Sequence, residues 1–426
     1  MKYAHLADLH LGSWRDEKMR DLSTQAFLKA IDQFIEQKID FILFAGDLFN
    51  TSLPSLDILK VVTSKLKELK DQQIPLYVIA GSHDFSPSGK TMIDVLENAG
   101  LLKNVCKGKI DPQTKQLQLN FTIDQKTGAK ITGILGKKGL LDKSYYQNLT
   151  LEPLEQESGY KIFMFHTTLT ELKPKHLQMM ESQPLSFLPK GFDYYAGGHV
   201  HHPTKLDISE YGTLTYPGAL FPNNFAELEK YENGGYYLVE VYERIKDQEN
   251  NKNNEDHKDK TDKTQKIEWV PLEIIKHKSI NLICKHKTPE QINIELLTMI
   301  SEEDFKDSLV TIRLSGELEQ GRLSEINFKL IFEQLYQQGA YFVMKNTAQL
   351  HSKEFEEIKI SECSPENVEE QIIKEHLQQI KLFDQETELH LTKSMLSALN
   401  TTKKEGETIT DFQKRIEEET SRLLDL

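Results

Sequence analysis

Residues 39–50 read IDFILFAGDLFN, and this stretch decides the fold of the first half of the chain. Five of its first six residues are apolar, which is typical of a short strand buried on both faces of a parallel sheet. The run stops at Ala45-Gly46-Asp47, where glycine allows a sharp turn. We therefore expect the Asp47 carboxylate at the carboxyl end of the strand, the edge of an open α/β sheet where ligands bind.

Other predicted strands end in the same way, with Asp or His directly after an apolar run. They are Tyr3–Leu9 with Asp8-Leu9-His10, Leu76–Ala80 with Gly81-Ser82-His83-Asp84, Tyr160–Phe165 with His166, and Tyr194–Ala196 with Gly197-Gly198-His199-Val200-His201. Segments with helical spacing of apolar residues separate the first three strands, which predicts a right-handed α/β unit with parallel strands. Several strand ends that all deliver Asp or His predict one metal site.

The composition sets outer limits. A chain of 426 residues with 38% hydrophobic residues is long enough for two or three domains with real cores. Its three cysteines are widely spaced and odd in number, so they predict a reducing compartment and no disulfide framework. The N-terminus MKYAHLADLH meets a charged residue before a signal peptide could form, and no apolar run is long enough for a membrane span. We expect a soluble, cytoplasmic protein without a membrane partner.

The pattern along the chain predicts three parts. Residues 1–277 would form the catalytic domain, in which the alternating segments Leu117–Ile123 and Ile131–Leu135 predict antiparallel strands of a second sheet. We assign Tyr236–Tyr242 to that second sheet as well. The stretch 246–266 contains no apolar residue, and because strands are predicted on both sides of it we interpret it as a hairpin loop rather than a domain linker.

Two further parts follow. Residues 280–350 combine two helical patterns with strands at 309–314 and 341–345, which predicts a small α+β domain. Residues 351–426 hold eighteen acidic and ten basic side chains, with apolar stripes at 368–380, at 389–399 and from 410 onward. We favour docking of these stripes onto a partner protein, and the alternative is a helical cap folded back onto the catalytic domain.

The candidate ligands suit a pair of divalent cations. Two cations about 3.5–4 Å apart need several protein donors, with one carboxylate bridging them. Mixed imidazole and carboxylate donors favour Mn²⁺, Fe²⁺ or Zn²⁺ over Ca²⁺ or Mg²⁺. The natural reaction at such a centre is phosphoester hydrolysis. The sequence contains neither the G-x-S-x-G motif of serine hydrolases nor a P-loop.

The order and spacing of these motifs resemble the calcineurin-like metallophosphoesterases. Within that superfamily the sequence is most similar to the SbcD-type nuclease subunit of the DNA double-strand-break repair complex, in an archaeal-looking short form. The resemblance covers residues 1 to about 275, and the motifs that carry it are AHLADLHLG, AGDLFN, GSHD, FH at Phe165-His166, GGHVH and YPGALFPNNFAE. It implies a four-layer α/β/β/α sandwich with a small α+β capping domain and C-terminal helices.

The resemblance also implies roles for single residues. Asp8, His10 and His201 would hold the first metal, and Asp47 would bridge the pair. The second metal would be held by Ser82, His166 and His199. His83 would contact the scissile phosphate or protonate the leaving oxygen, with Asp84 orienting it.

Cofactor and partners follow from the same resemblance. It implies two Mn²⁺ ions per chain and exonuclease and endonuclease activity on DNA, both on ends and on single and double strands. The capping domain would help to position DNA, the C-terminal helices would bind an SMC-like ABC ATPase, and the nuclease would form a homodimer. The protein would then act at the nucleoid.

Two positions depart from the family pattern. Position 82 is Ser where the superfamily usually has Asn, whose amide oxygen binds metal, so we expect weaker or water-mediated binding of the second cation. Position 50 is Asn where many relatives have a His linked to exonuclease action, so endonuclease activity is expected to survive better.

The formal net charge of −14 excludes a protein that coats nucleic acid with its whole surface. The two cations offset four charges, and Arg15, Lys18 and Arg20 could form a local basic rim; alternatively, they are ordinary solvated residues before a helix. The favoured function is a Mn²⁺-dependent DNA nuclease that acts with an ATPase. The alternatives are a small-molecule phosphodiesterase or phosphatase of the same superfamily, and a non-catalytic scaffold whose metal site is partly lost.

Overall fold

A computed structural model gives the structure of the chain, and it describes residues 1–86, 89–173, 181–243, 263–352, 384–403 and 407–424. The chain divides into two compact units, Met1–His351 and Ser352–Leu426. Among the described helices, none combines the length and the apolar composition that crossing a bilayer requires.

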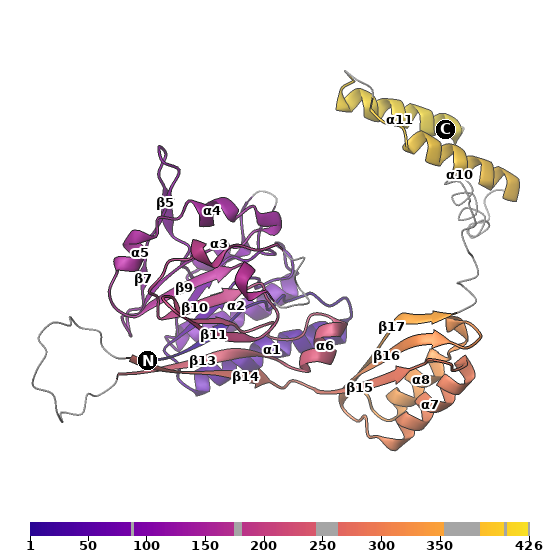
Figure 1. Cartoon of the computed structure of the whole chain (residues 1–426), viewed down its shortest axis with the longest axis horizontal. Helices are drawn as coiled ribbons and strands as arrows, with labels where there is room; N and C mark the ends of the chain where they lie inside the picture. The colour runs from indigo at the N-terminus through magenta and orange to yellow at the C-terminus, as the bar shows by residue number, and fades with distance from the viewer. Residues whose placement is uncertain (87–88, 174–180, 244–262, 353–383, 404–406, 425–426) are drawn as a thin grey trace, which may run out of the picture. The chain divides into compact units, whose positions relative to one another are not determined.

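A six-stranded sheet carries the first three predicted strand ends (Figure 1). Its strands, in spatial order, are β14 (Lys263–Leu272), β13 (Gly234–Glu243), β1 (Lys2–Leu6), β2 (Phe41–Ala45), β3 (Leu76–Ile79) and β4 (Lys103–Asn104). The four strands β1 to β4 pair in parallel, while β13 runs antiparallel to β1. The predicted parallel α/β unit is confirmed for these strands.

A second six-stranded sheet packs against the first. Its strands, in spatial order, are β11 (Thr204–Ile208), β12 (Gly212–Tyr216), β10 (Tyr194–Gly198), β9 (Lys161–His166), β8 (Lys130–Ile134) and β7 (Thr122–Ile123). A buried cluster between the sheets joins Tyr3, Phe41 and Tyr77 of the first to Ile162 and Tyr194 of the second. A two-stranded ribbon, β5 (Gly108–Ile110) and β6 (Leu117–Leu119), pairs separately.

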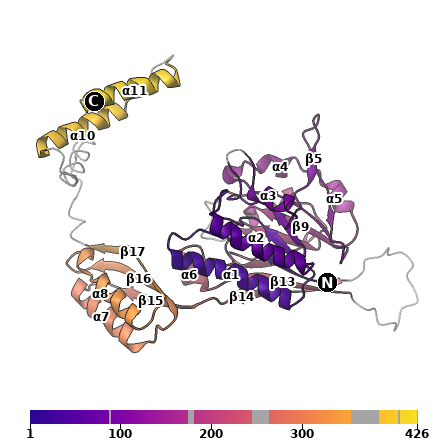
Figure 2. The same ribbon diagram turned by 180° about the vertical axis from the view of Figure 1, so that it is seen from behind.

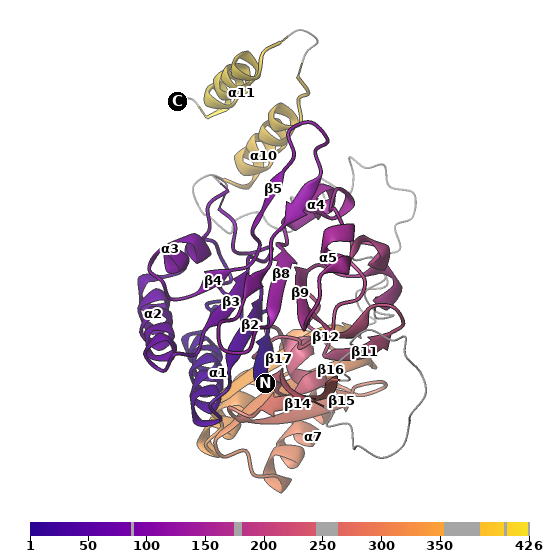
Figure 3. The same ribbon diagram turned by 90° about the vertical axis from the view of Figure 1, so that its left-hand side faces the viewer.

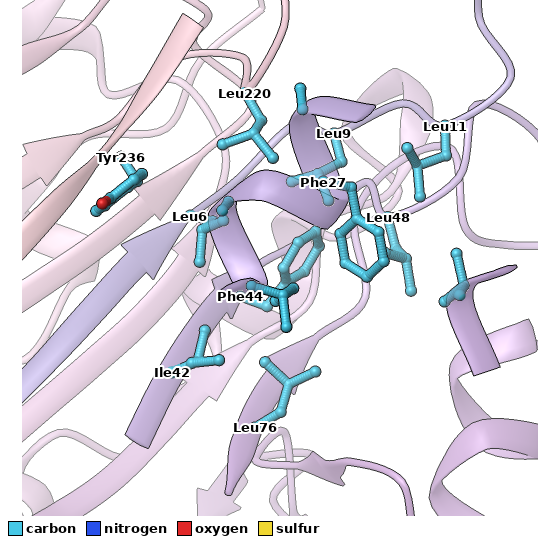
Figure 4. Close-up of a cluster of buried hydrophobic side chains, with 14 of the residues drawn as sticks. Leu6, Leu9, Leu11, Phe27, Ile42, Phe44, Leu48, Leu76, Leu220 and Tyr236 are labelled. Carbon is cyan, nitrogen blue, oxygen red and sulfur yellow. The ribbon is translucent and has the colours of Figure 1, made fainter. Parts of the chain in front are cut away.

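Helices cover the outer faces of both sheets and complete the four layers (Figures 2 and 3). They are α1 (Glu17–Glu36), α2 (Leu56–Asp71) and α3 (Met92–Asn98) on the first sheet, and α4 (Lys143–Gln147) and α5 (Glu152–Gln156) on the second. Figure 4 shows Phe27 of α1 in one cluster with Leu6, Ile42 and Phe44 of the strands. The α/β/β/α sandwich expected from the resemblance is therefore present.

Strand β13 lies in the first sheet, so our assignment of Tyr236–Tyr242 to the second sheet is wrong. Its register pairs Lys2 of β1 with Glu240. Tyr236 packs among the helices of the first sheet, whereas Val239 and Val241 lie in the cluster between the sheets. Both faces of β13 are thus apolar, and such a pattern does not reveal which sheet a strand joins.

Of the predicted hairpin loop 246–266, residues 263–266 belong to strand β14, and the rest lies outside the described residues. Strands β13 and β14 pair along their whole length, from Gly234 opposite Leu272 to Glu243 opposite Lys263.

Helix α1 begins earlier than expected, at Glu17, whereas Arg15, Lys18 and Arg20 were expected to precede it. The side chain of Asp16 accepts hydrogen bonds from the backbone N–H groups of Lys18 and Met19 and caps the helix there.

A small domain follows, with its own core and a three-stranded sheet. Its elements are β15 (Lys276–Ile283), α7 (Pro289–Glu302), β16 (Ser308–Leu318), α8 (Phe328–Gln337) and β17 (Phe342–Ser352). Ile280, Leu296, Ile312 and Leu335 are buried in that core. This is the α+β module that the pattern predicted. Its first strand begins at Lys276 and its last strand ends at Ser352. The domain limits 280–350 stay a prediction.

In the described part of the second compact unit, two helices pack against each other, α10 (Gln385–Leu399) and α11 (Ile409–Leu423). Asp384 caps α10 and Thr408 caps α11, in each case by accepting hydrogen bonds from backbone N–H groups of the first turn. The predicted stripe at 368–380 lies outside the described residues.

Candidate metal centre

Five strand ends of the two sheets meet at one place. The loops after β1, β2 and β3 contribute Asp8, His10, Asp47, Ser82 and His83, while β9 ends at His166 and β10 leads to His199 and His201. Three groups of potential ligand atoms, each within 4.8 Å, occur among the described residues: Asp8–His10–His201, His10–Asp47–His83 and Asp8–Asp47–His166. Shared members join these groups into one cluster.

Asp47 lies at the centre of this cluster. One carboxylate oxygen, Oδ2, is 3.2 Å from Nε2 of His166 and 3.6 Å from Nε2 of His10. The hydroxyl of Ser82 donates to the same oxygen at 3.3 Å, and the backbone N–H of His83 donates to Oδ1 at 2.7 Å. Asp47 thus lies between potential ligands from both sheets, which is the position expected of a carboxylate that bridges two cations.

The first sheet and the second sheet contribute facing imidazoles. Nε2 of His10 lies 3.2 Å from Nε2 of His201. The backbone N–H of His199 donates to both oxygens of Asp8, at 2.9 and 3.0 Å, and the ring of His199 lies 5.3 Å from that of His166, measured between centroids. The loop after β10 is thereby fixed against the loop after β1.

Hydrogen bonds at the outer ring nitrogens set which nitrogen faces the cluster. Nδ1 of His166 donates to the carbonyl of Ala45 at 2.7 Å, and Nδ1 of His201 donates to Oε1 of Glu227 at 2.9 Å. In both rings Nε2 therefore points toward the other ligands and is the nitrogen that would bind a cation. A carboxylate or carbonyl behind a ligating imidazole is the usual arrangement at metal sites.

Backbone conformations at the cluster are unusual. Asp8, His10, Asp47 and His199 all have positive φ angles, 54°, 43°, 59° and 85°. This left-handed region is unfavourable for residues with a side chain, and its occurrence at one place marks a functional site. The packing also requires glycine at position 46, because a Cβ atom there would lie 2.3 Å from Nδ1 of His166.

Burial and neighbouring charges shift the ionisation of the cluster. Burial raises the pKa of Asp8 to about 6, and burial lowers the pKa of His10 to about 3. Although burial opposes it, the charge of Asp47 raises the pKa of His166 to about 10. In the same way the charge of His166 outweighs burial and holds the pKa of Asp47 well below its usual range. Asp47 and His166 therefore form a tightly coupled, oppositely charged pair.

His201 and Asp84 are shifted as well. The Glu227 carboxylate outweighs the effect of burial and raises the pKa of His201 to about 8. Burial, with the charge of Asp47, raises the pKa of Asp84 to about 7. Asp84 accepts hydrogen bonds from the backbone N–H groups of Asp47, Gly81 and Phe49, at 3.0, 2.8 and 3.4 Å.

The carboxylate of Asp84 connects the loop after β2, which carries Asp47, to the loop after β3, which carries His83. We expected this carboxylate to orient His83. The ring of His83 is held by the carbonyl of Asn50, which accepts from its Nδ1 at 2.8 Å, and the orienting role of Asp84 stays a prediction. Asn50, one of the two departures from the family pattern, thus contacts His83 through its backbone.

An open pocket of about 640 Å³ exposes part of the cluster. His10, Asp47, Ser82, His83, His199 and His201 line it, together with residues of α6 (Phe225–Tyr231). Asp8 and His166 are buried behind the pocket wall. All of the predicted metal-site residues thus lie at one place; their individual roles remain predictions.

The donor set fits a pair of divalent cations. Carboxylate oxygens and imidazole nitrogens converge from two sheets, and the rings of His166 and His201 are held from behind by hydrogen bonds at Nδ1. Ser82 offers only a hydroxyl, which donates to Asp47. The residues present would therefore hold one cation through Asp8, His10 and His201 and a second through His166 and His199, with Asp47 between them.

Two residues of the predicted basic rim, Lys18 and Arg20, contact other parts of the chain. Nζ of Lys18 donates to the carbonyl of Tyr341 in the small domain at 3.0 Å, and the guanidinium of Arg20 donates to the carbonyls of Trp14 and Arg15. Lys18 and Arg20 line a second pocket, beside α2, and are absent from the residues that line the metal-site pocket.

Glu227 was not among the predicted site residues, although it lies within the stretch YPGALFPNNFAE. Glu227 hydrogen-bonds His201 and is held by the backbone N–H of Asn223 and the side-chain amide of Asn224. The spacing of Asn224 and Glu227 predicts a helix start, but it does not indicate that Glu227 contacts His201.

Comparison with known proteins agrees with this geometry. Residues 1–203 match the Calcineurin-like phosphoesterase family. The chain is 27% identical over 252 residues to DNA double-strand break repair protein Mre11 of Methanopyrus kandleri, and the aligned region covers 56% of this chain and 54% of that protein. The chain is 28% identical to the Mre11 protein of Methanococcus maripaludis, and the aligned region covers 57% of this chain and 63% of that protein. It is 27% identical to the SbcD subunit of the nuclease SbcCD of Staphylococcus epidermidis, with 59% of this chain and 67% of that subunit covered.

The fold and the strand-end cluster agree with the match of residues 1–203 to the Calcineurin-like phosphoesterase family. More narrowly, the chain is similar to the archaeal Mre11 and bacterial SbcD proteins. The aligned region spans only about half to two thirds of the length of these relatives.

Proposed function

We propose that this chain is a Mn²⁺-dependent phosphodiesterase that cleaves DNA during double-strand-break repair. The observation that carries the proposal is the convergence of Asp8, His10, Asp47, His166 and His201, with His83 beside them at an open pocket. The similarity to Mre11 and SbcD proteins supports DNA as the substrate.

The protein groups would divide the chemistry between them. Bound cations supply a polarised phosphoryl group and an activated water. His83 lines the pocket with its ring fixed by the Asn50 carbonyl, so its Nε2 is available to contact the scissile phosphate or to deliver a proton to the leaving oxygen. Asp84 keeps the loops of His83 and Asp47 together through backbone hydrogen bonds.

Partners and activities form the finer part of the proposal. Both exonuclease and endonuclease action are proposed, with endonuclease action favoured because position 50 is Asn. We propose that an SMC-like ABC ATPase binds the C-terminal helices and that the chain forms a homodimer. The small domain, as a capping domain, would help to position DNA.

One cleavage experiment separates the candidate functions. A linear DNA and a small phosphodiester are each incubated with the protein, with and without Mn²⁺, beside a His83→Ala variant. Cleavage of DNA that requires both Mn²⁺ and His83 is expected. Cleavage of the small ester alone would favour a small-molecule phosphodiesterase, and no cleavage of either would favour a non-catalytic scaffold.

A further inference from the structure

Helix α6 contacts the metal site on one side and the small domain on the other. It contains only seven residues, Phe225–Tyr231, and its glutamates Glu227 and Glu229 have different partners. An isolated helix of this length is unstable in water, so tertiary contacts must set its position. The two glutamates provide such contacts.

Glu227 connects the helix to the metal site. Its Oε1 accepts from Nδ1 of His201 at 2.9 Å, and its Oε2 accepts from the backbone N–H of Asn223 at 2.8 Å. Asn223 in turn accepts a hydrogen bond from the hydroxyl of Ser13, in the loop after His10. The orientation of the His201 ring therefore depends on where the start of α6 lies.

Glu229 connects the same helix to the small domain. Nε of Arg313, on β16, donates to both carboxylate oxygens of Glu229 at 3.0 and 2.9 Å, and Nη2 donates to Oε2. The guanidinium also lies over the ring of Phe225, 5.3 Å from its centroid. Arginine in this planar, multiply bonded arrangement fixes geometry as well as charge.

We propose that Arg313 is a positioning residue for the metal centre. Through Glu229 and Phe225 it holds α6, and through Glu227 the helix holds His201 in the orientation that binds a cation. The affinity of the Asp8–His10–His201 site then depends on contact between the small domain and α6. This inference rests on the proposed function, because it concerns the same cation site.

Calorimetric titration of the full chain with Mn²⁺ tests the proposal without using catalysis. Glu227→Gln removes the carboxylate behind His201 and is expected to weaken one class of sites by roughly 10- to 100-fold. Arg313→Gln should weaken the same class in the same direction, by about tenfold, because it releases the helix that carries Glu227. The exchanged pair Arg313→Glu with Glu229→Arg should recover part of the loss.

A matched control exists in the second compact unit. Arg415 makes the same kind of paired contact with Glu407, through Nε and Nη2 at 2.8 and 2.9 Å. Arg415→Gln should leave every Mn²⁺ affinity unchanged. Melting temperatures without metal should agree for the wild type, Arg313→Gln and Arg415→Gln, while the increase caused by Mn²⁺ should be smaller for Arg313→Gln alone.

The outcomes distinguish this inference from the proposed function. If the wild type binds no Mn²⁺, the proposed metal-dependent function is wrong. If the wild type binds Mn²⁺ and Arg313→Gln binds it equally well, only the inference is overturned. Should Arg313→Gln fail to fold, Glu229→Gln breaks the same ion pair from the other side; unchanged Mn²⁺ affinity in that variant overturns the inference too.

Discussion

Single residues of the metal centre hold unfavourable conformations. Asp8, His10, Asp47 and His199 have left-handed backbone angles, and each such residue costs on the order of 1–3 kcal/mol unless its surroundings enforce it. Hydrogen bonds between the loops provide that enforcement, since Asp84 accepts from the N–H of Asp47 and Asp8 accepts from the N–H of His199. These hydrogen bonds tie the loop after β3 to the loop after β2, and the loop after β1 to the loop after β10.

Replacing Ser82 by Asn tests the weakest predicted ligand. The Ser82 hydroxyl donates to Asp47, whereas an Asn side chain would extend an amide oxygen toward the second cation. Mn²⁺ titration of the wild type should give two unequal affinities, and Ser82→Asn should raise the weaker one, on the order of tenfold. Ser86→Asn, on the same loop, is the control. Two equally tight sites in the wild type would contradict the expectation.

His5 predicts a pH dependence of stability away from the ligands. It is fully buried in β1, where its Nδ1 lies 3.0 Å from both Tyr194 Oη and Thr215 Oγ1, and burial lowers its pKa to about 3. The unfolded chain, with a His pKa of about 6.5, takes up the proton first, so stability is lost as pH falls from about 6.5 toward 3.

The free energy of unfolding measured at pH 7 and pH 4 checks this effect. Between these two values His5 should contribute a loss of about 3 kcal/mol, at about 1.4 kcal/mol per pKa unit. His5→Gln should be less stable than the wild type at pH 7 and should lose less on acidification. Equal losses in the two proteins would show that the pKa of His5 is the same in the folded and in the unfolded chain.

At the scale of elements, the sequence predicted those features that short patterns encode. Apolar runs that end in Gly, Asp or His located β1, β2, β3, β9 and β10 and their shared edge. The neighbours of β13 were not predictable, because its residues face apolar layers on both sides and several edges could accept it. Glu227 was missed for a related reason, since its partner His201 is 26 positions away and only the fold brings them together.

A double-mutant cycle tests the placement of β13. The ring of Phe34 in α1 meets that of Tyr236 edge-on, with centroids 4.7 Å apart. Phe34→Leu and Tyr236→Leu should therefore show a coupling of about 0.5–1.5 kcal/mol in the free energy of unfolding. Phe34→Leu combined with Tyr195→Leu, on the outer side of the second sheet, should be additive. If the effects of Phe34→Leu and Tyr236→Leu on the free energy of unfolding are additive, the contact between α1 and β13 is contradicted.

At the scale of the whole molecule, charge is unevenly distributed. The region after residue 352 carries a net charge of −8, so its removal changes the net charge of the chain from −14 to −6. It begins where the first compact unit ends, and its two described helices pack on each other. An acidic segment of this kind disfavours DNA and suits a protein partner.

Removing residues 353–426 should separate catalysis from partner binding. Because the metal centre lies wholly within Met1–His351, the shortened chain should keep its fold, its Mn²⁺ affinities and its cleavage of short DNA. Cleavage should be equal to that of the full chain or faster, since less negative charge repels the substrate. Association with the proposed ATPase, followed by gel filtration of the mixed proteins, should be lost. Retained association would assign the ATPase contact to the first unit, and loss of cleavage with intact Mn²⁺ binding would mean that the acidic helices take part in handling DNA.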